Sequence, residues 1–313
     1  MVLPSRFSGS LLDFLCQRFP RLSEAQWRDR LDRGLVLGPD FLPLGPGSQP
    51  GAGARLFYYR VEDGEDHSTL PVSVVHEDED ILVADKPPFM PVLPQGRHVQ
   101  GSLLVQLKKG RPDLDELSPA HRIDMDTSGL VLFTKRACWR APFQNLFRDR
   151  DVHKRYEALV QWPPSGQDGH GGAADAWQSG TYWFSELQKQ AHFIPMHETR
   201  FWCQPSPKPD PDWPQGLACT QLMGWRDLQP GCRWVSLRPL TGQKHRLRAQ
   251  LNARGTPIAN DRIYPELLPF DAPVDHGRPL ALLAAELGFT DPRDGLRRGW
   301  QSGLTLPQAD GLG

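Results

Sequence analysis

Residues His121–Lys135 read H-R-I-D-M-D-T-S-G-L-V-L-F-T-K, and this stretch says most about the architecture of the chain. A dense polar cluster with two aspartates leads directly into Leu130–Phe133, an apolar run of the kind that forms a buried β-strand. A loop that enters a buried strand holds its side chains on a rigid scaffold and leaves them open to a substrate. The same residues are equally compatible with a solvated turn whose carboxylates cap backbone amides.

Outward from this stretch, short runs rich in branched and aromatic residues predict further strands, because each run is bounded by turn formers. The predicted strands are Val72–Val75, Ile81–Ala84, Leu130–Thr134, Tyr156–Gln161 and Arg233–Leu237. Helical segments are predicted between them, at Ala141–Phe147 and Gln243–Ala253. Strands and helices do not alternate strictly, so the pattern favours an α+β domain with a mixed, largely antiparallel sheet over a doubly wound parallel one.

The amino-terminal part of the chain has a helical pattern over residues 10–35. Apolar residues recur at helical spacing from Leu11 to Phe19, and Ser23–Gln26 has the pattern of a capping box that opens a second helix. Gly38–Gly53 is dense in Gly and Pro and predicts a loop or linker. Pro163–Gly180 contains few large apolar residues and predicts a surface insertion.

The charges of the chain nearly cancel, with 36 Lys and Arg against 37 Asp and Glu. A basic excess, the usual overall sign of nucleic-acid binding, is therefore absent from the total. The distribution is uneven, however. Between Arg97 and Arg155 about twelve basic residues stand against seven acidic ones, and between Arg233 and Arg262 about seven stand against one. Local charge sets the field at a groove, so this pattern is compatible with a basic face on a nearly neutral protein.

Cysteine content and hydropathy point to the compartment. The five cysteines are odd in number and show no C-x-x-C spacing, so neither a disulfide framework nor a zinc site is expected. No apolar run approaches the length of about 20 residues that spans a bilayer. A P-loop, a G-x-G-x-x-G before a helix, an H-E-x-x-H and a G-x-S-x-G are also missing. We expect a soluble, cytoplasmic protein with no membrane partner and no metal site.

Four motifs in order resemble those of one enzyme family. The stretch His121–Lys135 is similar to H-R-L-D-x-x-T-S-G-L-L-L-x-A-K, the signature of the RluA-type RNA pseudouridine synthases. Three further segments resemble the opening strand with its K-P turn, the K-x-Y-x-A-x-V motif and the long T-G-R-x-H-Q-L-R motif of that family. They are Val75–Pro91, Lys154–Val160 and Leu237–Tyr264. Leu282–Pro292 resembles the closing strand of the family.

The resemblance implies a fold, an activity and a domain organisation. The implied fold is α+β, with a bent mixed, largely antiparallel sheet and flanking helices, in a catalytic domain over residues 70–305. The implied activity is that of an isomerase, which converts specific uridines of rRNA or tRNA to pseudouridine as a monomer. No redox change occurs and no group is transferred, so no cofactor is expected. Residues 1–54 weakly resemble an S4-type RNA-binding module, and a helical extension is an equal alternative.

The resemblance also assigns catalytic roles. Asp124 is the expected nucleophile, whose carboxylate either forms a covalent adduct at C1′ or C6 of the nucleotide or assists formation of a glycal intermediate. Asp126 points to the same side in an extended segment and is the internal rival. Arg248 resembles the arginine that pairs with the nucleophile, since a carboxylate in a dry pocket needs a cation to stay ionised, and a phosphate-facing arginine is the alternative. Tyr156 resembles the tyrosine that stacks on the target base, and an ordinary core tyrosine is the alternative.

The expected substrate-binding residues come from the same motifs. Arg122 resembles the arginine near the flipped nucleotide, because a paired uridine must leave its stack before its glycosidic bond can be reached. Ile258 resembles an apolar residue beneath the base, although core packing explains an isoleucine equally well. Basic side chains that could contact phosphates, or could be solvated charges, are Lys86, Arg97, Lys154, Lys244 and Arg246. Thr127 and His245 complete the expected set.

Departures from the family pattern fall in the binding groove. The arginine expected after Gly242 is Gln243, the usual glutamine is Arg246, and the expected G-D pair is Asn260-Asp261. These changes affect substrate identity more than activity. An RNA-binding protein without catalysis is the rival from another functional class. Hydrolysis of a different glycoside is disfavoured, because that reaction normally uses two carboxylates that flank the bond.

Overall fold

The computed structural model describes residues 1–4, 9–20, 22–58, 71–95, 99–162, 177–189, 201–206, 218–268 and 272–308. The backbone divides into two compact units, Met1–Glu65 and Asp66–Gly313. Among the helices in these ranges, none is long and apolar enough to cross a membrane.

The first unit has two helices, α1 (Leu11–Arg18) and α2 (Glu24–Asp32), and two short antiparallel strands, β1 (Val36–Leu37) and β2 (Phe57–Tyr58). The capping box predicted for the second helix is confirmed. The Ser23 hydroxyl accepts from the Gln26 amide at 3.3 Å, and the Gln26 side chain accepts from the Ser23 amide at 2.9 Å. The unit extends past residue 54, because β2 pairs with β1. It has its own core, which includes Leu11, Leu15, Trp27, Leu31 and Leu56.

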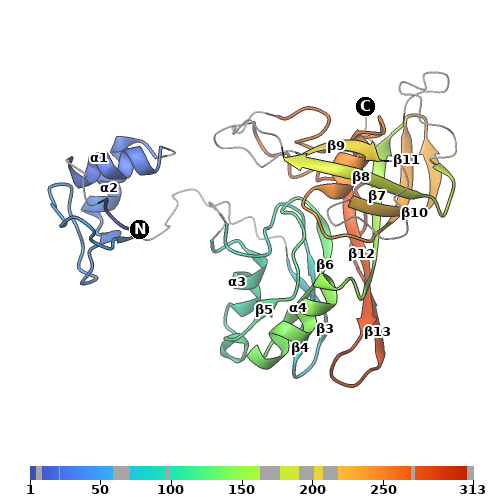
Figure 1. Cartoon of the computed structure of the whole chain (residues 1–313), viewed down its shortest axis with the longest axis horizontal. Coiled ribbons are helices and arrows are strands. Elements are labelled where there is room, and N and C mark those ends of the chain that lie inside the picture. The colour runs from blue at the N-terminus through green and yellow to red at the C-terminus, as the bar shows by residue number, and fades with distance from the viewer. Residues whose placement is uncertain are drawn as a thin grey trace. The chain divides into compact units, whose positions relative to one another are not determined.

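The second unit is built on one large sheet of eleven strands (Figure 1). Its main path runs β3-β4-β6-β12-β7-β11-β10-β8-β9, with β13 paired to β12 and β5 to β6. Every pairing is antiparallel except that of β6 with β12. The predicted mixed, largely antiparallel α+β fold is therefore confirmed. The strands are β3 (Ser73–Glu77), β4 (Ile81–Lys86), β5 (Ser118–Pro119), β6 (Ser128–Thr134), β7 (Val152–Gln161), β8 (Tyr182–Lys189), β9 (Phe201–Ser206), β10 (Ala218–Gln229), β11 (Cys232–Pro239), β12 (Leu282–Thr290) and β13 (Arg297–Gln301).

Helices flank both faces of the sheet at β4 and β6. Successive side chains of a strand point to opposite faces, so Leu82 and Ala84 of β4 lie on one face and Ile81 and Val83 on the other. Helix α3 (Leu103–Lys108) shares a hydrophobic core with Leu82 and Ala84 on the first face. Helix α4 (Arg140–Arg148) shares a second core with Ile81 and Val83 on the opposite face. Two short 3₁₀ helices, Pro112–Leu114 and Ala137–Trp139, complete this region.

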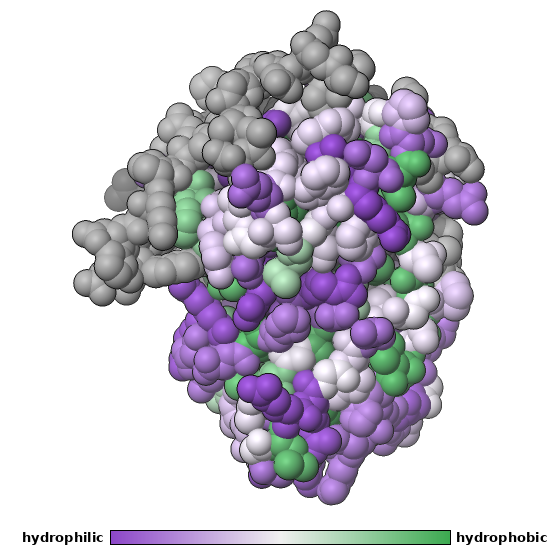
Figure 2. Space-filling view, turned by 90° about the vertical axis from the view of Figure 1, so that its right-hand side faces the viewer, coloured by the Kyte–Doolittle hydropathy of each residue, from purple (hydrophilic) through white to green (hydrophobic). Residues whose placement is uncertain are grey.

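Helix α5 (Arg246–Asn252) packs on the central strands through Leu247 and Leu251. It begins later than the predicted Gln243, because its N-cap His245 has a left-handed backbone with φ 55°, from which a right-handed helix cannot extend back to Gln243. The predicted insertion Pro163–Gly180 lies outside the described residues except at its end. Figure 2 shows one face of the molecule, on whose described part hydrophobic residues form small separate areas between hydrophilic ones.

Gly129 fixes the start of β6 against β12. It pairs with Ala284 in the parallel register and has φ 112°, a backbone conformation that favours glycine. A Cβ atom at this position would lie 2.3 Å from the Ala284 carbonyl oxygen. The close approach requires the glycine of the S-G dipeptide, and it anchors the polar loop that precedes β6.

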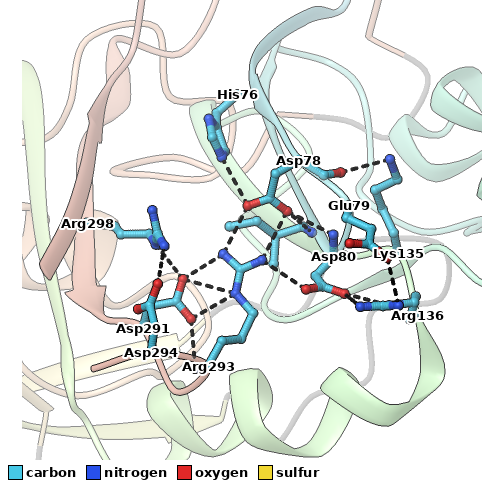
Figure 3. Close-up of polar contacts among 11 residues, drawn as sticks. His76, Asp78, Glu79, Asp80, Lys135, Arg136, Asp291, Arg293, Asp294 and Arg298 are labelled. Carbon is cyan, nitrogen blue, oxygen red and sulfur yellow. Dashed lines mark hydrogen bonds and ion pairs between the residues drawn. The ribbon is translucent and has the colours of Figure 1, made fainter. Parts of the chain in front are cut away.

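An ionic cluster joins two turns that are far apart in the sequence (Figure 3). Arg293, in the turn between β12 and β13, donates to both carboxylate oxygens of Asp78 at 3.0 Å and to Asp291 at 2.7 Å. It also reaches Asp80 at 3.2 Å, in the turn between β3 and β4. Asp291, whose side chain is fully buried, accepts a further bond from Arg298 at 2.6 Å. We call Asp78, Asp80, Asp291, Arg293 and Arg298 the ionic clasp.

The ionic clasp predicts acid sensitivity. Burial alone would raise the pKa of Asp78, but hydrogen bonds from Arg293 and from backbone amides hold it well below its ordinary value, and the pKa of Asp291 is also lowered. A lowered folded-state pKa gives stability that is complete above the unfolded carboxyl pKa of about 4 and is lost as the pH falls further. We expect the free energy of unfolding, measured in urea, to decline steeply below about pH 4.

Arg293→Ala is expected to lower the free energy of unfolding at pH 7 by about 2–3 kcal/mol, because it removes from the buried Asp291 and the partly buried Asp78 and Asp80 the donor that they share. The acid-dependent part of the stability should shrink in this variant. Arg297→Ala, which removes an exposed arginine of β13, is the matched control and should change neither quantity. If the free energy of unfolding falls equally with pH in wild type and in Arg293→Ala, the ionic clasp does not contribute to the acid sensitivity.

Candidate active site

A buried arginine lies at the centre of the polar residues that the motifs predicted. Arg248 of α5 is 1% exposed. Its Nε and Nη2 donate to the two carboxylate oxygens of Asp261 at 2.8 and 2.7 Å. Asp261 also accepts from the amides of Ile263 at 2.8 Å and Tyr264 at 3.2 Å. Burial by itself lowers the pKa of Arg248, but the charge of Asp261 and its hydrogen bonds raise it above the ordinary value. The guanidinium is therefore charged and fixed in orientation.

The two aspartates of the polar loop lie near the Nη1 and Nη2 atoms of this guanidinium. The Asp124 carboxylate lies 4.0 Å from Nη1, and the Asp126 carboxylate lies 3.7 Å from Nη2. Nη1 is buried and makes no hydrogen bond to any described residue. The Asp124 side chain is 20% exposed and that of Asp126 is 11% exposed, so Asp124 is the more open of the two. Catalytic contacts that are long in a free enzyme commonly shorten when substrate binds.

Lys86 supports the polar loop from the end of β4. Its side chain is fully buried, and Nζ donates to the carbonyl oxygens of Met125 at 2.9 Å and Pro87 at 2.8 Å. Burial lowers the pKa of Lys86 to about 7, against the raising effect of Asp126 and Asp124. Met125 lies between the two aspartates, so this bond positions both. Lys86 was expected to contact an RNA phosphate, but its side chain is fully buried and is not accessible to one in this structure.

Tyr156 lies beside the aspartates on β7, where it pairs with Leu237 of β11 and Ala284 of β12. It is half-buried. Burial raises the pKa of its hydroxyl to about 12, while Arg246 lowers that pKa and Asp124 raises it. The hydroxyl is therefore protonated near neutral pH, and the strand holds the ring next to the loop.

The predicted phosphate contacts separate into buried and exposed groups. Arg246 is 6% exposed and donates from Nη1 to the Thr241 hydroxyl at 2.6 Å and to the Thr241 carbonyl. It therefore braces its own loop and is not an exposed phosphate ligand in this structure. Lys244 and Arg122 are exposed, as a groove contact requires, and Lys154 is half-buried. Arg97 lies outside the described residues.

Three further predicted residues are buried. Thr127 is 2% exposed in the turn closed by its amide to the Asp124 carbonyl oxygen at 3.2 Å. His245 is 2% exposed, with its ring edge-on to Tyr264 at 6.1 Å between centroids. Ile258 is 1% exposed and belongs to the core shared with Ala158 and Val160, as the core-packing interpretation requires.

Asp261 is the residue whose role sequence reasoning missed. The signal was present, because Asn260-Asp261 replaces the G-D pair of the family motif. Asn260 has φ 61°, and asparagine is among the few residues besides glycine that tolerate this conformation. Its side chain donates to the Pro279 carbonyl at 3.0 Å. The substitution therefore preserves the turn that carries Asp261 into the core.

His121, the first residue of the motif, has a structural role. The Leu132 amide of β6 donates to its Nε2 at 3.1 Å, and its ring stacks on Phe147 at 4.2 Å between centroids. Burial, followed by the nearby charge of Lys154, lowers the pKa of His121 to about 3. The imidazole is therefore neutral. Among the described residues, no group of His, Cys, Asp and Glu is arranged to hold a metal ion.

Comparisons with known proteins agree on one family. The sequence model of the RNA pseudouridylate synthase family matches residues 80–253. An uncharacterized RNA pseudouridine synthase from Synechocystis is 28% identical over 81% of this chain and 79% of that protein. The dual-specificity RNA pseudouridine synthase RluA of Vibrio cholerae is 28% identical over 71% and 78% of the two chains. The tRNA pseudouridine(31) synthase of Saccharomyces cerevisiae is 31% identical over 61% of this chain. That match spans 46% of the yeast protein.

A solved structure shares the fold. Human RNA pseudouridylate synthase domain containing 1 superimposes with a TM-score of 0.52 and 20% identity over 79% of this chain and 94% of that chain. At this identity the likeness concerns the fold alone. The residues matched by the family model include Asp124, Tyr156 and Arg248.

Proposed function

This chain belongs to the RNA pseudouridylate synthase family, and from that premise we propose that it isomerises specific uridines of rRNA or tRNA with Asp124 as nucleophile. The observation that carries the assignment is the approach of the Asp124 carboxylate to 4.0 Å from the unbonded Nη1 of Arg248. The buried positive charge of Arg248 therefore faces the carboxylate that is proposed to act as nucleophile. We further propose that the protein acts as a monomer in the cytoplasm.

The remaining residues support this assignment by position. Tyr156 presents a protonated aromatic side chain beside the loop, suited to stack on a base that has left its helix. Lys86 fixes the loop through Met125. Arg122 and Lys244 are exposed and are proposed to contact the nucleotide and its phosphates. Arg246 and Ile258 are proposed to shape the site from within.

The first unit is proposed to be an S4-like RNA-binding module. Its two capped helices are followed by the short strand β1, and it contains its own apolar core. An independent core is what a separate binding module needs. RNA affinity of the full chain compared with that of residues 66–313 would measure its contribution.

The test of the proposed function is a map of pseudouridines in total RNA from cells with and without the gene. We expect a small set of positions to lose pseudouridine in the deleted strain and to regain it when the gene is returned. The number and identity of these positions then define the substrate. An unchanged map, together with RNA bound to the purified protein, would favour the rival function of RNA binding without catalysis.

A further inference from the structure

A cleft of about 360 Å³ opens at the start of β7, the strand that also carries Tyr156. Arg150 comes from the turn between α4 and β7, Lys154 from β7 itself, and Arg238 from the end of β11. The other described residues of the lining are Val152, Pro239 and Leu240, so among the residues that the structure describes three cations and no carboxylate line the cleft.

Asp151, next to Arg150, is exposed to solvent, and two other nearby carboxylates are engaged by arginines outside the cleft. Asp149 pairs with Arg148 at 2.8 Å, and Glu157 pairs with Arg155. Within the described part of the chain, the side chains of Lys154 and Arg238 make no hydrogen bond and no ion pair. Lys154 lies over the Phe147 ring at 5.9 Å from its centroid. The cleft therefore concentrates positive charge, and within the described part of the chain the side chains of Lys154 and Arg238 have no carboxylate partner.

The buried Arg246 repels two of the cleft cations, Lys154 and Arg150. Burial, and then the charge of Arg246, lowers the pKa of Lys154 to about 8. Burial is likewise the main reason why the pKa of Arg246 falls to about 10, and the charge of Arg150 lowers it further. Like charges that are held together in a partly buried cleft cost free energy, and a bound anion would remove that cost.

The backbone at Arg150 is a second, independent sign of function. Its φ is 68°, in the left-handed region that disfavours a long side chain. The turn is held by the Asp149 amide to the Asn145 carbonyl at 2.7 Å and by the Asp151 amide to the Leu146 carbonyl at 2.8 Å. Glycine would adopt this turn without strain. An arginine kept there against backbone preference points to a use for its side chain.

The cleft lies next to the reacting residues. Lys154 and Tyr156 are two positions apart on β7, so their side chains leave the same face of the sheet. Arg246 acts electrostatically on both of them. A group bound in the cleft would therefore lie beside whatever stacks on Tyr156.

We propose that Arg150, Lys154 and Arg238 form a binding site for a phosphate group, supplied by the RNA backbone close to the reacting uridine. The identification of the ligand as an RNA phosphate rests on the proposed function. The affinity of the cleft for a phosphate group does not depend on that function. Arginines suit this ligand, because a guanidinium can donate two parallel hydrogen bonds to phosphate oxygens. Such contacts position the substrate without reading its sequence.

The test compares three variants of the full chain with wild type in their binding of a synthetic RNA stem-loop with a uridine-rich loop. Arg238→Ala and Arg150→Gly each remove one cleft cation, and Arg148→Ala is the control, because it removes the same charge from exposed, neighbouring α4. We expect each cleft variant to weaken binding several-fold and to lower the slope of log Kd against log salt by about 0.7–0.9. Arg148→Ala should leave that slope nearly unchanged.

Stability and free phosphate complete the test. Arg150→Gly should have a melting temperature equal to or above that of wild type, because glycine relieves the left-handed turn, so its weaker binding cannot be a folding defect. Inorganic phosphate should raise the melting temperature of wild type more than that of Arg238→Ala at equal ionic strength. If phosphate has this effect while RNA binding is the same in all variants, the cleft binds free phosphate and its assignment to RNA is wrong.

The outcomes also separate this proposal from the proposed function. RNA binding and phosphate response that are both unaffected in the two cleft variants would overturn the phosphate site and leave the enzymatic assignment standing. A reduced salt slope in a protein that makes no pseudouridine in any RNA would support the site and refute the enzymatic function.

Discussion

Asparagine at position 124 is expected to abolish pseudouridine formation while the fold and the RNA affinity remain close to wild type. Asp124→Asn removes the nucleophile and one negative charge but keeps the shape of the side chain. The carboxylate is 20% exposed, lies 4.0 Å from Arg248 Nη1 and makes no hydrogen bond to the residues that the structure describes, so little stability depends on it. Loss of a nucleophile costs at least about 10⁴-fold in rate. Single-turnover conversion of the RNA identified by mapping, with saturating protein, measures this loss separately from binding.

Asp126→Asn is the matched control within the same loop. Asp126 is more buried than Asp124 and lies nearer to the guanidinium, at 3.7 Å, so we expect a loss of stability but substantial turnover. The comparison decides between the two carboxylates, because each change removes one charge from the same loop. An inactive Asp126→Asn together with an active Asp124→Asn would reverse our assignment.

Arg248→Met is expected to have the largest effect on both stability and activity. The substitution leaves the fully buried Asp261 carboxylate without its charged partner, a change that costs about 3–5 kcal/mol. It also removes the cation that faces Asp124, so turnover should be lost. Urea denaturation measures the first effect and single-turnover conversion the second.

Two further variants separate the structural role of Arg248 from the catalytic one. In Arg248→Met combined with Asp261→Asn no unpaired charge remains at the pair, so we expect much of the lost stability to return without activity. Arg248→Lys keeps the charge but cannot reproduce the two-fold contact with Asp261, so intermediate stability and low activity are expected. Recovery of turnover in the double variant would show that the nucleophile does not need this cation.

The local elements of the fold could be predicted from the sequence to a large extent. The runs at Ile81–Ala84 and Leu130–Thr134 are apolar because both faces of β4 and β6 are covered by helices, and this burial is visible in composition alone. The capping box at Ser23 is a local pattern and was correct in detail. The start of α5 was misplaced, because the left-handed backbone at His245 leaves no mark in hydrophobic periodicity.

The sequence by itself determined the family, the order of its motifs and the pair of aspartates, one of which is the proposed nucleophile. These conclusions depend on residue types at short, fixed spacing, which is what a sequence records directly. Tertiary structure alone decided which charges are buried. Lys244 and Arg246 are two residues apart and chemically alike, yet one is exposed and the other braces Thr241 in the interior. The bond from Lys86 to the polar loop and the pairing of Asp261 with Arg248 likewise depend on the tertiary contacts among β4, α5 and the polar loop. Burial and partner choice depend on contacts between distant segments, and these contacts set the energy of each charge.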